Sequence, residues 1–411
     1  MSPKTPDPLA PQSTEPMLID DSDRYSRLRL ISWWNQEKLR KAKVFVVGAG
    51  ALGNEVLKNL ALLGVGQVYV IDLDEIEDSN LTRSVLFRAR DRGKSKAFAA
   101  AEALRDINPD THATPIHGNV ITDIGLGLFR DVDVVIGCLD NREARLWVNR
   151  CCWKVGRPWV DGGIQEINGV LKVFQPPDGA CYECAMTEND YRLINLRYSC
   201  PLLKREDMLA GKVPTAPTIA SMIGGLQTQE ALKLIHGMPV NSGQALIFNG
   251  IANTFYNTVF QRKDDCLSHD TYPQPVELAL SHESTAEELF AEARKHFSDP
   301  AASSGRGAPP TEFSLHLDRD LVLSVHCESC KNSRRIFRPQ QAVGAKEAIC
   351  RECGGTARPE MTHAIESGSE HASQRLCDLG IPRYDIVRVS DSAEAEQFFL
   401  LAGDRNAVMH P

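Results

Sequence analysis

KVFVVGAGALGNEVLKNLALL, residues 43–63, joins an apolar run to a glycine-rich turn and then to a segment with helical periodicity. The run from Lys43 to Val47 predicts a buried strand. Gly48, Gly50 and Gly53 follow it as a G-x-G-x-x-G pattern. The first glycine allows a tight turn, the second lets the backbone approach a phosphate, and the third lets helix and strand pack closely. The N-terminus of the following helix favours an anion. This stretch therefore predicts a phosphate-binding turn between a strand and a helix.

Strand and helix patterns alternate on the C-terminal side of this turn. Short apolar runs predict strands at 67–71, 133–138, 158–162 and 169–174, and helical patterns lie at 96–107 and 142–155. Alternation of this kind is typical of a parallel sheet with helices on both faces. We expect an α/β, Rossmann-like, doubly wound and mainly parallel sheet. A strong helical pattern at 218–235 and two strands within 245–260 would complete it.

The chain divides by composition into four parts. Residues 1–20 are Pro-rich and polar and predict a disordered arm, and residues 21–270 form the nucleotide-binding domain. A stretch without clear period at 186–214 predicts a crossover loop within that domain. Residues 271–310 hold a helix from Ser284 to Phe297 and a Gly/Ser/Pro linker from Asp299 to Pro310, which we take as the domain boundary. Residues 311–411 form a small C-terminal domain, and we expect the activity of the first domain to survive its deletion.

Charge and composition limit the function classes. The net charge of −8 argues against a broad nucleic-acid-binding surface. No apolar run is long enough to span a membrane, and the N-terminus lacks a signal-peptide pattern, so we expect a cytoplasmic protein. Six of the 12 cysteines lie in C-x-x-C pairs, which in that compartment indicate metal binding rather than disulfides.

Charged residues near predicted strand ends favour a triphosphate over NAD. Asp72 ends the second strand, where a carboxylate suits ribose hydroxyls, and Asp74 follows it. Arg83 and Lys96 are cations that suit a triphosphate, because its charge must be neutralised before attack on the α-phosphate. Asp140 follows another strand, where a carboxylate can hold Mg²⁺. The alternative is that the two cations are solvated and that Asp140 only caps a helix.

The ordered set of motifs resembles one family. It is similar to the adenylating enzymes related to ubiquitin-activating enzymes and to the bacterial activators of molybdopterin and thiamin biosynthesis. The resemblance covers about Arg24 to His269. Family members usually carry glutamine after each of two arginines, where this chain has Leu28 and Ser84. The residues that match are Arg24-Tyr-Ser-Arg27, Gly48 to Gly53, Asp72-Leu-Asp74, Asn80-Leu-Thr-Arg83, Lys96, Asp140-Asn141, Cys181-Tyr-Glu-Cys184 and Thr215 to Ile235.

The resemblance implies ATP-dependent adenylation of the C-terminal glycine carboxylate of a ubiquitin-like or sulfur-carrier protein. It implies that Asp72 holds the ribose and that Asp140, beside Asn141, binds Mg²⁺. It further implies that Asn80, Arg83 and Lys96 bind phosphates. Arg27 resembles an arginine that reaches across a homodimer, so a homodimer is expected.

Cys200, in Tyr198-Ser-Cys200-Pro201, lies in the predicted crossover loop, where relatives of ubiquitin-activating enzymes carry the thioester-forming cysteine. Arg197, Lys204 and Arg205 lie near it in sequence and would favour a thiolate. The other interpretation is an inert loop cysteine. Cys138, Cys151 and Cys152 fall on a predicted strand or helix, where cysteine usually acts as a small hydrophobe.

Two sets of ligands predict zinc sites. Cys181-x-x-Cys184 and Cys266-x-x-His269 could make one tetrahedral site, although the family usually has cysteine where His269 stands, and His269 could be an ordinary surface histidine. Cys327-x-x-Cys330 and Cys350-x-x-Cys353 have the spacing of a zinc ribbon. Such ribbons usually stabilise a fold rather than catalyse.

Four functions compete at this point. The first is an activating enzyme that passes a ubiquitin-like protein to Cys200 and then to a conjugating enzyme or target. The second is an adenylyltransferase that activates a sulfur carrier for thiocarboxylate formation. A nicotinamide-dependent dehydrogenase would leave Arg83, Lys96 and the cysteine pairs unexplained. An inactive scaffold would need none of the charged residues.

Overall fold

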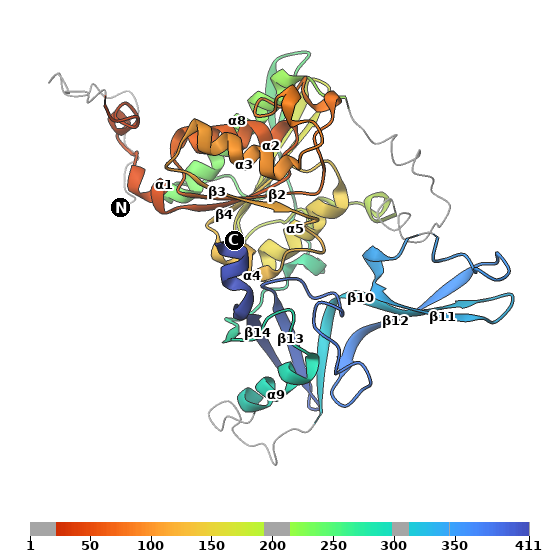
Figure 1. Cartoon of the computed structure of the whole chain (residues 1–411). Coiled ribbons are helices and arrows are strands. Elements are labelled where there is room, and N and C mark those ends of the chain that lie inside the picture. The colour runs from red at the N-terminus through yellow and green to blue at the C-terminus, as the bar shows by residue number, and fades with distance from the viewer. Residues whose placement is uncertain (1–21, 193–213, 298–311, 345, 411) are drawn as a thin grey trace.

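The computed structural model describes residues 22–192, 214–297, 312–344 and 346–410 (Figure 1). The expected disordered arm and Cys200 lie outside these residues. Over the described part, the chain builds an eight-stranded sheet and a separate six-stranded sheet. The first carries the phosphate-binding turn, so its topology decides where the site lies.

The large sheet is doubly wound, as expected, and its strands run in the order β3-β2-β1-β4-β5-β6-β7-β8. The first five strands in that order pair in parallel, and β6, β7 and β8 pair antiparallel. Their bounds are β1 Lys43–Val47, β2 Gln67–Asp72, β3 His112–His117, β4 Val134–Gly137, β5 Trp159–Gln165, β6 Asn168–Phe174, β7 Gln244–Asn249 and β8 Thr254–Val259.

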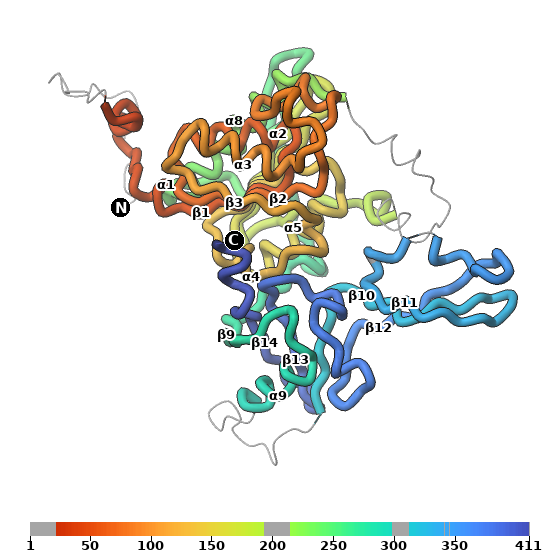
Figure 2. Tube along the Cα trace, viewed as in Figure 1, coloured from red at the N-terminus to blue at the C-terminus, as the bar shows by residue number. Residues whose placement is uncertain are grey.

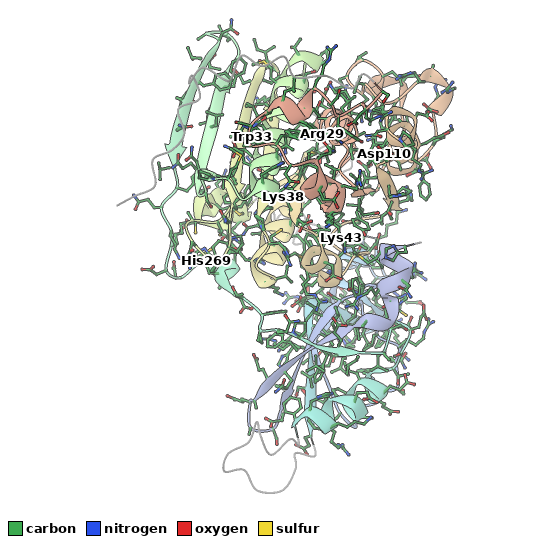
Figure 3. All side chains as sticks on the ribbon, turned by 90° about the vertical axis from the view of Figure 1, so that its left-hand side faces the viewer. Arg29, Trp33, Lys38, Lys43, Asp110 and His269 are labelled. Carbon is green, nitrogen blue, oxygen red and sulfur yellow. The ribbon has the colours of Figure 1, made fainter. Side chains whose placement is uncertain are left out.

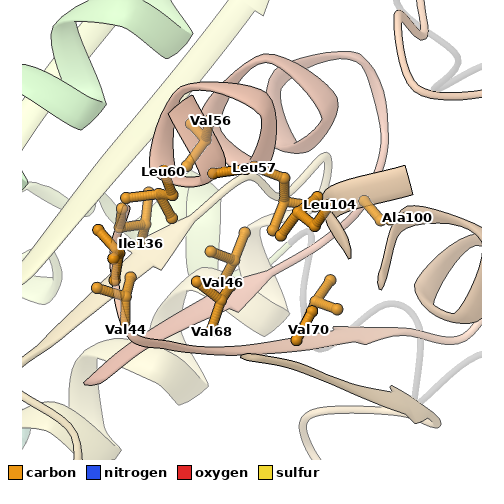
Figure 4. Packing of buried hydrophobic residues seen from close by; sticks show 14 of the residues in the cluster. Val44, Val46, Val56, Leu57, Leu60, Val68, Val70, Ala100, Leu104 and Ile136 are labelled. Carbon is orange, nitrogen blue, oxygen red and sulfur yellow. The ribbon is translucent and has the colours of Figure 1, made fainter. Parts of the chain in front are cut away.

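Alternate residues of β1 point into two different cores, which explains why this strand is apolar throughout. Val44 and Val46 pack against α2 (Ala51–Leu63) and α3 (Lys96–Ile107), as Figure 4 shows. Phe45 and Val47 face the opposite core, where α4 (Leu126–Asp131) and α5 (Arg142–Lys154) lie. α1 (Gln36–Lys41) and α8 (Pro217–His236) contribute to the first core. Among the described helices, none combines the length and apolar character that a bilayer crossing requires.

The C-terminal domain is a six-stranded sheet in the order β11-β10-β13-β14-β9, with β12 also paired to β10 (Figure 2). Two helices, α9 (Ala286–Phe297) and α10 (Arg405–Met409), accompany it. The strands are β9 Val276–Leu278, β10 Phe313–Cys327, β11 Ser333–Pro339, β12 Ala357–Glu366, β13 Ile386–Asp391 and β14 Glu396–Leu401.

The expected domain boundary at 299–310 divides this domain internally. β9 pairs in parallel with β14, with Val276 opposite Phe399, although more than a hundred residues of sequence separate them. Leu289 and Phe290 of α9 share a core with Phe313 and Leu315 of β10. A helix and a strand that bury their apolar faces in one core belong to one domain. The helix expected in 271–310 is therefore part of the C-terminal domain.

The C-terminal domain completes the core on the α4 and α5 face of the large sheet. Tyr384 is fully buried and belongs to the same apolar cluster as Phe45, Tyr69 and Met409. The backbone N–H of Gly127 donates to the carbonyl oxygen of Tyr384 at 2.8 Å. The C-terminal domain is thus docked on the first domain, and the expectation that the first domain keeps its activity without it stays a prediction.

Two elements of the first domain, a strand and a short helix, differ from the sequence expectations. β3 has Pro115 at its centre and a histidine at each end, a composition that sequence patterns do not assign to a strand. It lies at the edge of the sheet, where a missing N–H is tolerated. α4 is only six residues long, too short for a clear period.

Candidate functional site

The glycine turn has the backbone geometry that its sequence predicts. Gly48 adopts a φ of +99°, and a Cβ there would lie 2.5 Å from the carbonyl oxygen of Cys138. A Cβ on Gly53 would lie 2.0 Å from the Gly48 carbonyl oxygen. By contrast, a Cβ on Gly50 would meet no atom within 4 Å. The turn is therefore packed tightly on its strand side, and the position of the second glycine faces open space.

Asn54, on the first turn of α2, contributes to the site although no sequence motif singles it out. Its side chain is fully buried and donates from Nδ2 to the carbonyl oxygens of Ala49 at 2.7 Å and Gly50 at 3.0 Å. Its Oδ1 accepts the N–H of Leu86 at 2.9 Å. It thus fixes the glycine turn to the segment that follows Arg83. A polar residue within the apolar stripe of α2 is the signal that could have revealed it.

Asp72 lies at the carboxyl end of β2 and is already bound to the turn. Its two oxygens accept N–H groups from Ala49 at 2.7 Å and Asp74 at 2.8 Å. Burial raises the pKa of Asp72, and nearby Lys96 partly opposes that effect. The ammonium nitrogen of Lys96 lies 2.7 Å from an Asp74 carboxylate oxygen. The carboxylates and the lysine that the sequence singled out therefore meet beside the glycine turn.

Asn80 and Arg83 lie on the loop between β2 and α3. Asn80 accepts the N–H of Glu77 at 2.9 Å through its side-chain oxygen, and Arg83 donates to the carbonyl oxygen of Ser79 at 2.7 Å. Arg83 is half-buried as a whole residue, and its hydrogen bond to Ser79 lies on the exposed side of the loop. The loop is held to the glycine turn through the Asn54 contact to Leu86.

Asp140 follows β4, and β4 pairs with β1. The side chain of Asn141, not that of Asp140, caps α5, by accepting the N–H of Ala144 at 2.8 Å. Asp140 is exposed, and one carboxylate oxygen accepts a 3.2 Å bond from the Asn141 amide. Because β2, β1 and β4 are parallel neighbours, Asp72, the glycine turn and Asp140 all lie at the carboxyl ends of these strands. Open α/β sheets bind their ligands at the carboxyl ends of the strands.

Arg27 does not join this group within its own chain. The segment around it is anchored by Tyr25, whose hydroxyl donates to Asp110 at 3.0 Å and accepts from Asn108 at 2.7 Å. Both partners follow α3 and precede β3, at the amino ends of the parallel strands. Figure 3 shows this side of the molecule, with Arg29, Trp33 and Asp110 labelled. Arg27 thus lies near the amino ends of the strands, and the glycine turn lies at their carboxyl ends.

The first metal cluster is assembled in the structure, including its histidine. The sulfur of Cys181 lies 3.7 Å from that of Cys184 and 3.5 Å from that of Cys266. Nε2 of His269 lies 3.4 Å from the Cys184 sulfur, and the four ligand atoms lie within 4.8 Å of one another. Tetrahedral zinc with thiolate ligands sets sulfurs roughly 3.8 Å apart. Burial lowers the pKa of His269, which favours the neutral ring that binds metals. These residues therefore fit a zinc ion.

Glu183, inside the first C-x-x-C, braces this cluster. It is 1% exposed and accepts hydrogen bonds from Arg150 at 2.6 Å and Tyr191 at 2.8 Å, and also from Ser268. Ser268 lies between Cys266 and His269, so this contact ties the two halves of the cluster directly together.

The second metal cluster is also assembled, at the outer end of β10. The Cys327 and Cys353 sulfurs lie 3.4 Å apart, and those of Cys330 and Cys350 lie 3.6 Å apart. All four sulfurs lie within 4.8 Å of one another. Four thiols at this spacing fit a structural zinc ion. Cys377, by contrast, is close to neither cluster's ligand set.

Comparison with known proteins agrees with this geometry. The adenylyltransferase and sulfurtransferase MOCS3 of Mus musculus is 28% identical over 405 residues, which cover 95% of this chain and 84% of that protein. The ubiquitin-like modifier-activating enzyme 5 of Dictyostelium discoideum is 32% identical over 235 residues, or 53% of this chain, and the match spans 60% of that enzyme. The crystal structure of E. coli MccB with succinimide matches with a TM-score of 0.50 and 27% identity, covering 60% of this chain and 74% of that one.

The family itself follows from a match to most of the first domain. A model described as the ThiF family matches residues 23–268, which run from the segment before Arg27 to the second half of the first metal cluster. That range contains the glycine turn, the carboxylates and the lysine described above. The chain belongs to the ThiF family.

Proposed function

We propose that this enzyme uses ATP to adenylate the C-terminal glycine carboxylate of a ubiquitin-like or sulfur-carrier protein. One observation carries the proposal: in a ThiF-family chain, the glycine turn, Asp72, Lys96 and Asp140 gather at the carboxyl ends of three neighbouring strands. The relatives named adenylyltransferase and modifier-activating enzyme support it. A dehydrogenase would have no use for the lysine and carboxylates beyond the ribose site.

The proposed chemistry joins the carrier to AMP. A carboxylate oxygen of the carrier attacks the α-phosphorus of ATP, the bond to the β-phosphate breaks, and pyrophosphate leaves. Asp72 binds the ribose, and the N–H groups at the start of α2 face the phosphates. Asn80, Arg83 and Lys96 bind phosphate oxygens, so Lys96 exchanges its contact with Asp74 for the nucleotide. Asp140, beside Asn141, would hold Mg²⁺, which supplies further charge neutralisation when bound.

A homodimer would complete the site. Arg27 lies near the amino ends of the strands of its own sheet, away from its own nucleotide site. Its guanidinium can therefore contact a nucleotide only in a second copy of the chain. We propose that Arg27 reaches the partner's phosphates in a symmetric dimer, the commonest closed assembly. Mixing Arg27→Ala with Asp140→Ala enzyme would restore part of the activity if the site is shared. No restoration would refute the shared site.

After adenylation, two routes are open. In the first, the thiol of Cys200 attacks the acyl-adenylate, AMP leaves, and the thioester passes to a conjugating enzyme or target. In the second, a sulfur donor converts the adenylate to a thiocarboxylate. The second route is favoured by the match to an adenylyltransferase and sulfurtransferase across 95% of this chain. We place either route in the cytoplasm, where the described cysteines, all free, would stay reduced.

ATP–pyrophosphate exchange in the presence of a carrier protein ending in Gly-Gly tests the adenylation step. We expect exchange with the wild type and its loss in Asp140→Ala. Near-normal exchange in that variant would refute the assignment. Mass spectrometry without reductant then separates the routes: a reductant-sensitive adduct absent from Cys200→Ala shows a thioester, and adenylated carrier without adduct shows sulfur transfer.

A further inference from the structure

Arg145 connects the loop of Asp140 to the end of the neighbouring strand. From α5, its Nη2 donates to the carbonyl oxygen of Leu139, directly before Asp140. The same nitrogen donates to the carbonyl oxygen of Gly162 on β5 at 2.9 Å, and Nε donates to Asp161 at 2.9 Å. One guanidinium therefore holds three acceptors on the loop after β4 and on β5.

The charges beneath this contact are buried. The Asp161 side chain is fully inaccessible, and that of Arg145 is 14% exposed. Lys172 on β6 adds a second cation, 3.3 Å from the other Asp161 oxygen. Burying such charges costs desolvation energy, and the attraction between them often does no more than offset that cost. A gain in stability is therefore a weak explanation for this buried ion pair. Their geometry is specific, because a planar guanidinium fixes several acceptors at once.

Asp140 itself has looser support. Its carboxylate is exposed, and its contact to Asn141 joins two adjacent residues of the same loop. The Leu139 carbonyl is one residue away and is fixed to β5 through Arg145. The direction in which the Asp140 carboxylate leaves the sheet therefore depends on that carbonyl.

We propose that Arg145, held by buried Asp161, is a positioning residue that sets Asp140 for its divalent cation. The inference rests on the proposed function, in which Asp140 holds Mg²⁺. Residues behind metal ligands commonly change metal affinity without touching the metal. Arg145→Lys keeps the charge and loses the three-way contact, so metal-dependent binding should weaken while metal-free nucleotide binding stays.

The experiment measures the ATP dissociation constant by calorimetry, with excess Mg²⁺ and with EDTA. The ratio of the two constants is the gain that Mg²⁺ provides. We expect this gain to fall roughly tenfold in Arg145→Lys, with the EDTA value unchanged. Arg142→Lys is the matched control, because Arg142 lies on the same helix, is 55% exposed and pairs with Asp190. It should keep the wild-type gain.

Asp161→Asn is the second variant, because it keeps the shape of the side chain and removes the charge that holds Arg145. It should lower the gain in the same direction, and it decides the matter if Arg145→Lys does not fold. An unchanged gain in the folded variants, or an equal loss with Mg²⁺ and with EDTA, would overturn the inference. A wild-type enzyme that binds ATP with no Mg²⁺ gain would also overturn it. A wild-type enzyme that does not bind ATP at all would instead refute the proposed function.

Discussion

Lys154, the last residue of α5, donates hydrogen bonds to both carboxylate oxygens of Asp318 on β10, at 2.8 and 2.7 Å. The contact crosses from the first domain to the C-terminal domain. Tyr272 lies beneath it, with the Lys154 nitrogen 4.8 Å from the ring centroid. The Lys154–Asp318 contact and the buried Tyr384 together show that the two domains form one folded unit.

Replacing Lys154 with methionine should weaken that unit. The aliphatic volume is kept, but the exposed Asp318 carboxylate loses two charged hydrogen bonds, and we expect a cost of about 1 kcal/mol in unfolding free energy. Urea unfolding measures it. Pairing the change with Asp318→Leu should recover part of the loss, since no unpaired carboxylate remains. A double variant as unstable as the sum of both single variants would show that the two residues are not coupled.

Tyr384 tests how much the domain contact contributes. Tyr384→Ala removes a fully buried ring from the core beneath β1 and β2 and should cost about 4 kcal/mol. The control is Tyr384→Phe, which keeps the ring and loses the hydroxyl contacts to Asp131 and Arg405, for about 1 kcal/mol. The two thermal midpoints would be compared. Equal and small shifts of the thermal midpoint in both variants would mean that the contact at Tyr384 contributes little to stability.

Asp385 predicts a pH dependence of stability. Burial raises its pKa to about 6, with Arg319 opposing the effect. The unfolded value is lower, about 3.9, so between these pH values the folded chain binds more protons and stability falls as pH rises. Asp385→Asn keeps a side-chain oxygen for the N–H of Leu126 and should be more stable than the wild type at pH 7, by about 2 kcal/mol.

The Asp385 comparison should be repeated at pH 3.5, where the advantage of the asparagine is expected to disappear. Asp106→Asn, on the exposed side of α3, is the matched control for the change from a carboxylate to an amide. An advantage of the same size at both pH values would mean that ionisation of Asp385 is not its cause.

Metal content checks the two clusters. We expect two zinc ions per chain by elemental mass spectrometry, and one in His269→Ala, because three thiols alone hold the first ion poorly. His269→Cys should retain both ions, since zinc accepts either ligand. Cys377→Ala lies outside both ligand sets and should change nothing. A full complement of zinc in His269→Ala would remove the histidine from the ligand set.

Two glycines separate nucleotide binding from folding. Gly53→Ala places a methyl group 2.0 Å from a carbonyl oxygen and should lower both thermal stability and ATP affinity. Gly50→Ala meets no protein atom within 4 Å, so it should fold normally and lose ATP affinity only. Thermal shift with and without ATP distinguishes them. Normal ATP affinity in Gly50→Ala would mean that phosphate does not approach that position.

Features with a local cause could be predicted from the amino-acid sequence. A strand, a glycine turn and a helix need only the residues between Lys43 and Leu63, and their pattern predicted β1, the turn and α2. The two C-x-x-C pairs of the ribbon likewise follow from short ligand spacing. Asp72 and Asp140 could be chosen because they lie at or just after strand ends, and parallel strands bring those ends together. Lys96 could be chosen because it begins the helix that follows the Asp72 loop.

Features that depend on distant residues could be seen only in the fold. β9 pairs with β14, so the helix before the linker joined the C-terminal domain. Asn54 and Arg145 act through buried hydrogen bonds to backbone carbonyls, and no spacing in the sequence reports such partners. His269 follows Ser268, whose hydroxyl donates to Glu183, 85 residues earlier. Local propensity determines which segments form helices and strands, but strand pairing and burial across the chain determine which segments become neighbours. These long-range contacts bring the residues of the candidate site together.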